Sequence, residues 1–253
     1  MGLRGGALTA ALLLADSLTW GAVGAQVSDR SPEAYRAETV VNGGRIEGRV
    51  LLGSASPRSA LLFVAKDQAV CGTGTRRVPI VRNNGEALLD AVVYIERIER
   101  GKAFRAAARK VTINQASCHF MPHITVLANG GVLEAINSDP VLHNIHVFAL
   151  RNTLRQSIFY VSQPQRGDIT SKTIALEETG PLLVSCDAHQ FMRAHVLVVG
   201  NPYYAKVDSG GDFSLDDVPP GSYVVKVWHH ALGSRTRHVE VSSGSTTEIR
   251  LSY

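Results

Sequence analysis

The sequence carries a cysteine, a histidine and a methionine in the pattern C-x-x-H-x-x-M, at Cys186, His189 and Met192. Upstream of this stretch a second histidine, His143, is followed directly by Asn144. A thiolate is a soft ligand that binds copper in both oxidation states, imidazoles suit the same metal, and a thioether adds a weak further bond. These residue types predict one type 1 copper ion, held in its plane by the thiolate and both imidazoles and on its axis by Met192.

The other histidines leave alternatives open. His195 follows Met192 closely and could replace the thioether as the axial ligand, which would give a harder site. His119 and His123 flank a short segment beside a cysteine, where they serve either structure or a second metal site or electron path. We expect three further histidines to pack in the fold or to lie on the far face of a strand from the copper ligands: His146, His229 and His230.

The first residues predict a secretory signal peptide, residues 1–25. It has a positive start, a short apolar run from Ala7 to Leu14 and small residues before an expected cleavage after Ala25. An uncleaved anchor is the alternative. No later segment approaches the roughly 18 apolar residues of a membrane helix, so we expect a periplasmic or secreted chain with no membrane span after cleavage.

The chain has three cysteines, an odd number for an exported protein. Metal ligation explains one unpaired thiol, at Cys186, and exclusion then predicts a disulfide between Cys71 and Cys118. The alternative for Cys186 is an inert buried thiol.

The formal net charge is +4, and most basic residues are scattered. One dense run is either a solvated surface or a docking patch for an acidic redox partner protein of unknown identity. The run consists of Arg97, Arg100, Lys102, Arg105, Arg109 and Lys110. Aromatic residues do not alternate with these cations, so we expect no nucleic-acid binding.

Short segments rich in valine and isoleucine, bounded by Gly, Pro, Asn or Asp, predict an all-β sandwich or barrel. The apolar run Leu182–Val184 predicts a buried strand that delivers Cys186 at its end, and alternation over 223–227 predicts a half-buried strand. Ala- and Arg-rich residues 98–110 predict a helical turn. The other expected strands are 45–52, 60–64, 91–95, 124–127, 132–137, 145–150 and 196–199.

On its two motifs the chain resembles the cupredoxins of the plastocyanin and azurin group. The His143–Asn144 pair follows an Asn-x-Asp turn at 137–139, and the spacing of Cys186 and His189 matches the plastocyanin loop. The resemblance implies a Greek-key β-sandwich, and it implies that Asn144 braces the cysteine loop by hydrogen bonding. The loop from the second histidine to the methionine is shorter than in plastocyanin, so the planar ligands carry over more directly than the axial one.

The segment after Asn201 resembles a carboxypeptidase regulatory-like, transthyretin-like β-sandwich module. The likeness rests on a Gly-Gly turn at 210–211 and a Pro-Pro-Gly turn at 219–221 that opens a strand. The order of motifs from Gly48 to Tyr203 also resembles bacterial exported plastocyanin-like proteins labelled methylamine-utilisation-like, which implies an electron-transfer context.

These observations predict a signal peptide at 1–25, an N-terminal β segment at 26–110 that packs with the cupredoxin, a cupredoxin copper-binding domain at 111–200 and a small β-sandwich module at 201–253. The expected function is one-electron transfer by an exported copper protein that is not an enzyme. A non-redox copper-binding or storage module and a structural envelope protein are the alternatives. The chain has no C-x-x-x-C motif for a binuclear copper centre; oxidative or NO chemistry at an open copper position stays open.

Overall fold

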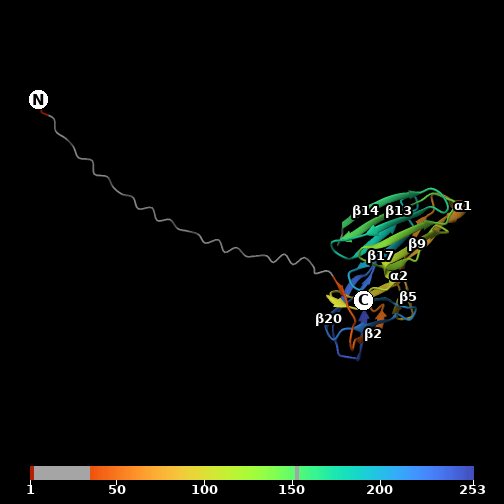
Figure 1. The fold of residues 1–253 in the computed structure, drawn as a ribbon. Coiled ribbons are helices and arrows are strands. Elements are labelled where there is room, and N and C mark those ends of the chain that lie inside the picture. Colours follow the sequence, from red (N-terminus) through yellow and green to blue (C-terminus); the bar gives the residue numbers. More distant parts are fainter. Residues whose placement is uncertain (3–34, 152–153) are drawn as a thin grey trace. The chain divides into compact units, whose positions relative to one another are not determined.

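The computed structural model describes residues 1–2, 35–151 and 154–253. The predicted signal peptide and its cleavage point lie outside these residues, apart from the first two. From Tyr35 onward the chain is almost entirely β (Figure 1), which confirms the predicted fold class. Among the described residues, α-helix is limited to two single turns, α1 (Gln68–Cys71) and α2 (Ala106–Arg109). None of the helices in this part of the chain has the length and apolar character needed to cross a membrane.

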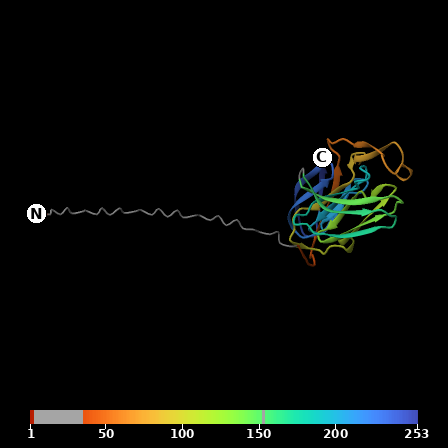
Figure 2. The ribbon, with the colours of Figure 1, turned by 90° about the horizontal axis from the view of Figure 1, so that it is seen from above.

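A first sandwich is formed by a four-stranded and a five-stranded sheet. The four-stranded sheet contains β10 (His119–Met121), β9 (Lys110–Ala116), β12 (Gly131–Asn137) and β15 (Ile169–Ile174). The five-stranded sheet contains β11 (Ile124–Ala128), β17 (Arg193–Val199), β16 (Pro181–Ser185), β13 (His143–Arg151) and β14 (Leu154–Gln163). Figure 2 shows the long antiparallel pair of β13 and β14 in green. Alternate side chains of both sheets, such as Ile113, Leu133 and Val147, share one buried core.

A second β domain combines strands from both ends of the chain. One sheet contains β18 (Tyr204–Lys206), β7 (Ala91–Ile95), β20 (Gly221–His229) and β21 (Gly233–Val241). The other contains β19 (Asp212–Val218), β2 (Gly44–Leu51), β6 (Ala87–Leu88) and β5 (Asn83–Asn84), with β22 (Thr246–Ser252) also paired to β2. Side chains from both sheets, such as Ile46, Val93 and Val225, form its core.

The N-terminal segment therefore does more than pack on the first sandwich. Strand β2 lies between β19 and β22, and β7 lies between β18 and β20, so both complete sheets of the C-terminal segment. The limits predicted at 110 and 201 describe the chain order but not the sheets. Gly48 of β2 shows how close the contact is, because a Cβ there would lie 1.8 Å from the carbonyl oxygen of Ile249.

Another part of the N-terminal segment does reach the first sandwich. Strands β3 (Arg58–Phe63) and β4 (Thr75–Val81) pair antiparallel, and the segment that connects them contains α1. Val64 and Cys71 of this segment join the core of the first sandwich. A disulfide links Cys71 to Cys118, as predicted, with the two Cα atoms 5.2 Å apart. A short pair of β1 (Arg36–Ala37) and β8 (Arg100–Gly101) completes the strands of the described residues.

Strand β17 contacts two cores. Its even-numbered residues, Ala194, Val196 and Val198, belong to the core of the first sandwich. Its odd-numbered residues Leu197 and Val199 pack instead with Val92 and Trp228 of the second domain. Because successive side chains of a strand point to opposite faces, His195 faces away from the first core.

Candidate metal centre

Three potential metal ligands converge at one end of the first sandwich. The Nδ1 atoms of His143 and His189 are 3.1 Å apart, and the Cys186 sulfur lies 3.9 Å and 3.7 Å from them respectively. A triangle with these sides has its centre about 2.1 Å from every corner, close to the roughly 2.0–2.3 Å that a first-row metal keeps to imidazole nitrogen and thiolate sulfur. All three residues are at most 2% exposed. The donor set therefore fits a trigonal metal ion.

Strand pairing explains why these residues meet. Strands β13 and β16 are antiparallel neighbours, with His146 opposite Ser185. His143 at the start of β13 and Cys186 just beyond the end of β16 therefore emerge at the same end of the sheet. Backbone hydrogen bonds then turn the following loop back, because the amide of His189 donates to the carbonyl of Cys186 at 3.3 Å and that of Met192 donates to the carbonyl of His189 at 2.9 Å.

Asn144 holds the cysteine loop in place. Its side-chain oxygen accepts hydrogen bonds from the amides of Asp187 at 2.8 Å and Ala188 at 3.3 Å, and from the Cys186 thiol at 3.4 Å. These are the contacts expected of the bracing role that the cupredoxin resemblance implied. They fix the sulfur relative to His143, the residue next to Asn144.

Two carboxylates orient the two imidazoles. The Nε2 atom of His143 lies 2.9 Å from Asp139, and that of His189 lies 2.9 Å from Asp67. Each imidazole thus donates a hydrogen bond from Nε2 to a carboxylate and points Nδ1 toward the centre of the triangle. Metal-bound histidines usually have such a partner on the nitrogen that does not bind the metal. Sequence reasoning missed both acids. Asp139 had a local signal, since it belongs to the Asn-x-Asp turn before His143, but nothing near Asp67 indicated its place.

Asp139 also ties the site to the disulfide. It accepts backbone hydrogen bonds from Ser117 and Cys118, both at 2.7 Å. Burial alone would raise the pKa of Asp139, but the hydrogen bonds from Cys118, His143 and Ser117 outweigh it and hold that pKa below its ordinary value. The carboxylate is therefore charged at neutral pH. It can orient His143 by accepting a hydrogen bond from the imidazole.

Met192 and His195, the two candidates for the axial position, lie in different places. Met192 is 1% exposed and belongs to the same core as Cys186. His195 is grouped instead with His123 and His230. Its ring packs edge-on against Trp228, with the centroids 6.3 Å apart. Of these two side chains, Met192 is the one in the core that contains the cysteine.

The metal-free protonation states follow from burial. Burial raises the pKa of the Cys186 thiol, so the free side chain keeps its proton at neutral pH. Burial, with the neighbouring His143, lowers the pKa of His189, so this imidazole is neutral and offers a lone pair. Metal binding at this site would accordingly release the thiol proton.

Other sequence candidates lie outside this group. His146 bonds Asp187 and Ser157, both at 3.0 Å, and His119 contacts the Ser117 carbonyl at 2.9 Å. Cys118 is close to Asp139 and His143, but its sulfur is in the disulfide and is no free ligand. Within the basic run, three members have partners on the chain: Lys102 near Asp217, Arg109 over Phe104 and Lys110 with Glu134.

Comparison with known proteins gives partial matches. A family model described as "Polysaccharide lyase family 4, domain II" matches residues 181–249. No curated protein is similar enough to count as a match. The carboxypeptidase regulatory-like identity of residues 201–253 therefore stays a prediction.

Solved structures that resemble parts of this chain include cupredoxins. A purple cupredoxin from Nitrosopumilus maritimus is 19% identical, with a TM-score of 0.29, over 35% of this chain and 99% of its own. Amicyanin from Paracoccus versutus is 19% identical, with a TM-score of 0.30, over 42% of this chain and 97% of its own. A copper-containing nitrite reductase from Thermus scotoductus SA-01 is 17% identical, with a TM-score of 0.29, over 35% of this chain and 22% of its own. The case for a metal rests on the side-chain geometry described above.

Proposed function

We propose that this chain is an exported type 1 copper protein that carries one electron at a time. His143, Cys186 and His189 would hold one copper ion, with the Met192 thioether as a weaker fourth ligand. The observation that carries the proposal is the buried triangle of two imidazole nitrogens and one sulfur, whose centre suits bonds of about 2.1 Å. Softness of the thiolate favours copper over harder metals.

Bound copper would supply the exchange between the cuprous and cupric states. The chain contributes a site that changes little between them. Asn144 fixes the sulfur, Asp139 and Asp67 fix the imidazoles, and backbone bonds close the loop from Cys186 to Met192. Ligands held this firmly need little rearrangement when the charge of the ion changes.

Burial favours a carrier over a storage module. A storage site must release its ion readily, whereas the three planar ligands here are at most 2% exposed. An electron needs no open path to the ion. We place a redox partner protein, of unknown identity, near Asp67 and Leu142, because both residues are exposed and lie beside the ligand histidines.

The test is the visible spectrum of the full chain after loading with Cu²⁺. We expect one copper per chain, an intense thiolate-to-copper charge-transfer band and reversible bleaching by a reductant. Cys186→Ser should lose the band, while Ser185→Ala, a change beside the ligand, should keep it. A colourless loaded protein, or the same band in Cys186→Ser, would overturn the proposal.

A further inference from the structure

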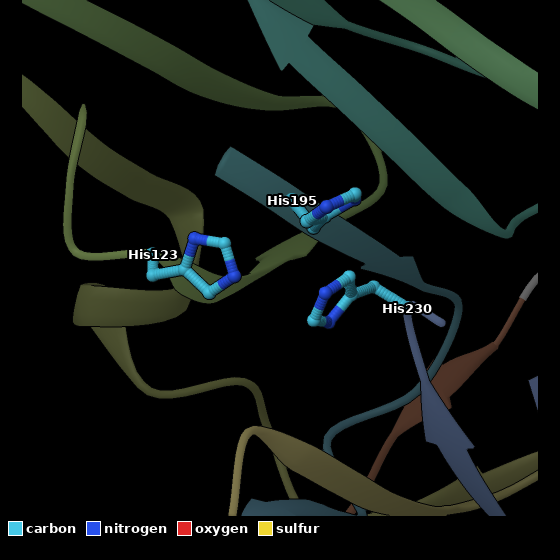
Figure 3. A group of neighbouring side chains, drawn as sticks. All are labelled: His123, His195 and His230. Carbon is cyan, nitrogen blue, oxygen red and sulfur yellow. The ribbon is translucent and has the colours of Figure 1, made fainter. Parts of the chain in front are cut away.

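A second group of histidines lies apart from the copper ligands. His123 stands between β10 and β11, His195 is in β17 and His230 follows β20. One ring nitrogen of each lies within 4.8 Å of the others, and Figure 3 shows the three rings around a common space. The ring centroids are 4.3 Å apart for His195 and His230, 5.1 Å for His123 and His230 and 5.6 Å for His123 and His195. The first sandwich supplies two of these rings and the second β domain supplies the third.

Ring nitrogens in this group lack partners. Among the described residues, five buried side-chain polar atoms have no hydrogen-bond partner. Three of the five are the Nδ1 atoms of His195 and His230 and the Nε2 atom of the adjacent His229. An unsatisfied buried polar atom costs about 1–3 kcal/mol, so such a concentration in one place calls for a missing ligand.

The third histidine is already oriented like a metal ligand. The Nδ1 atom of His123 bonds the carbonyl of Arg193 at 3.1 Å. A carbonyl can only accept, so Nδ1 carries the proton and the Nε2 atom keeps its lone pair. A backbone carbonyl on the outer nitrogen is a common partner of a metal-bound imidazole.

The surroundings keep all three rings neutral. Burial lowers the pKa of His123, His195 and His230, so each has a free lone pair at neutral pH. The nearby Asp90 carboxylate, paired with Arg82 at 2.6 Å through both of its oxygens, partly opposes this effect at His123 and His230. The negative charge of Asp90 would also favour a cation bound beside these two rings.

We propose that His123, His195 and His230 form a second metal site that binds a divalent, nitrogen-preferring transition-metal ion of the Zn²⁺ or Cu²⁺ class. Three imidazoles and no sulfur are the donor set of such ions. Around a tetrahedral ion with bonds of about 2.1 Å, ligand nitrogens lie about 3.4 Å apart. Rings without hydrogen bonds can rotate to reach this spacing. His123 and His230 are only partly buried, so a fourth position is left for water.

The site would join the two β domains. Trp228 and Leu197 pack together beside it in an apolar contact between the two domains. An ion bound to β17 and to the end of β20 would add a bond across this contact. It should therefore stabilise the folded chain, by an amount that grows with the logarithm of the ratio of its concentration to its dissociation constant.

Zinc is the probe, because it has no redox chemistry to confuse with the copper centre. The experiment uses the full chain with Cys186→Ser, in which the thiolate ligand of the first centre is absent. Isothermal titration with Zn²⁺ should show one ion bound per chain. His123→Ala and His230→Ala, made separately in this background, should each weaken binding at least tenfold, while the exposed His238→Ala should leave it unchanged.

A second measurement guards against variants that fold poorly. Zn²⁺ should raise the urea midpoint of the Cys186→Ser chain and of its His238→Ala derivative, but not that of the His123→Ala or His230→Ala derivative. The proposal is overturned if the Cys186→Ser chain binds no zinc. It is also overturned if zinc binds equally well without His123 and His230, since the ion would then be held elsewhere, for example by His143 and His189. Neither result depends on whether the first centre binds copper.

Discussion

Replacing Asp67 by asparagine tests whether the outer carboxylate tunes the copper centre. The side chain keeps its size, and asparagine tolerates the left-handed backbone at this position, where φ is 54°. The change removes one negative charge and weakens the hydrogen bond to the Nε2 atom of His189, now 2.9 Å long. The fold of the metal-free protein should be unaffected.

The size of the effect on the reduction potential follows from distance and exposure. The Asp67 carboxylate is 2.9 Å from the Nε2 atom of His189. Adding the width of the imidazole ring and a metal bond of about 2.1 Å puts the carboxylate about 7 Å from a bound ion. At that distance two unit charges interact by about 0.6 kcal/mol in water and about 2.4 kcal/mol at an effective dielectric constant of about 20. The Asp67 side chain is 37% exposed, so we take an intermediate value of about 1 kcal/mol. For one electron this corresponds to about 40 mV. Because a negative charge favours the cupric state, its removal should raise the potential.

Copper affinity should fall as well. Loss of an outer partner of a metal-bound histidine typically costs about 10- to 100-fold in affinity. Competition against a chromophoric chelator measures this loss, and spectroelectrochemistry measures the potential. The urea midpoint of the metal-free variant reports whether the fold is intact.

Asp187→Asn is the matched control. Asp187 is on the same loop as Cys186 and His189, but its carboxylate bonds His146 and its side chain is 53% exposed. It should shift the potential slightly and leave the affinity unchanged. The reasoning is refuted if Asp67→Asn binds copper as tightly as the parent protein at an unchanged potential, or if Asp187→Asn loses as much affinity.

Three further outcomes are expected. Replacing Cys71 and Cys118 by serine opens a loop with a sequence separation of 47 residues and should lower the free energy of unfolding by about 4 kcal/mol in urea titrations; no loss would mean that the bond does not form in solution. Met192→Leu should raise the reduction potential with copper still bound, whereas His195→Ala should not; the opposite result would make His195 the axial ligand. Burial lowers the folded-state pKa of His195 from 6.5, so below about pH 6.5 the unfolded chain takes up a proton that the folded chain does not. The free energy of unfolding of the metal-free protein should therefore fall as the pH drops below about 6.5, and it should fall less steeply in His195→Leu. Equal dependence on pH in urea titrations of the two proteins would contradict this.

The meeting of His143, Cys186 and His189 could be predicted because strand ends determine their positions. Cys186 and His189 lie in one short loop, and His143 precedes a strand that pairs with the strand leading to Cys186. The spacing of these three residues along the chain was therefore nearly enough to predict that they meet. The disulfide followed from the odd number of cysteines, once Cys186 was assigned to the metal.

Other features depend on contacts between distant segments. Asp67 reaches His189 from 122 positions away, and no local pattern marks an acid for such a role. The sequence predicted only a packing role for His230. Its place beside His123 could not be foreseen, because the contact between the two domains brings these residues together. Strand β2 pairs with β22 although nearly the whole chain separates them, so a domain limit drawn along the sequence could not describe that sheet.

The disulfide connects the segments of the two carboxylates that orient the proposed copper ligands. Cys71 ends the single helical turn that begins after Asp67, and its amide donates to the Asp67 carbonyl at 2.8 Å. Cys118, at the other end of the bond, donates its amide to Asp139 at 2.7 Å. One covalent link therefore joins the segment that holds His189 to the segment that holds His143. Because the hydrogen bonds to these carboxylates favour the orientation that turns Nδ1 inward, two cysteines outside the proposed ligand set help to determine the geometry of the site.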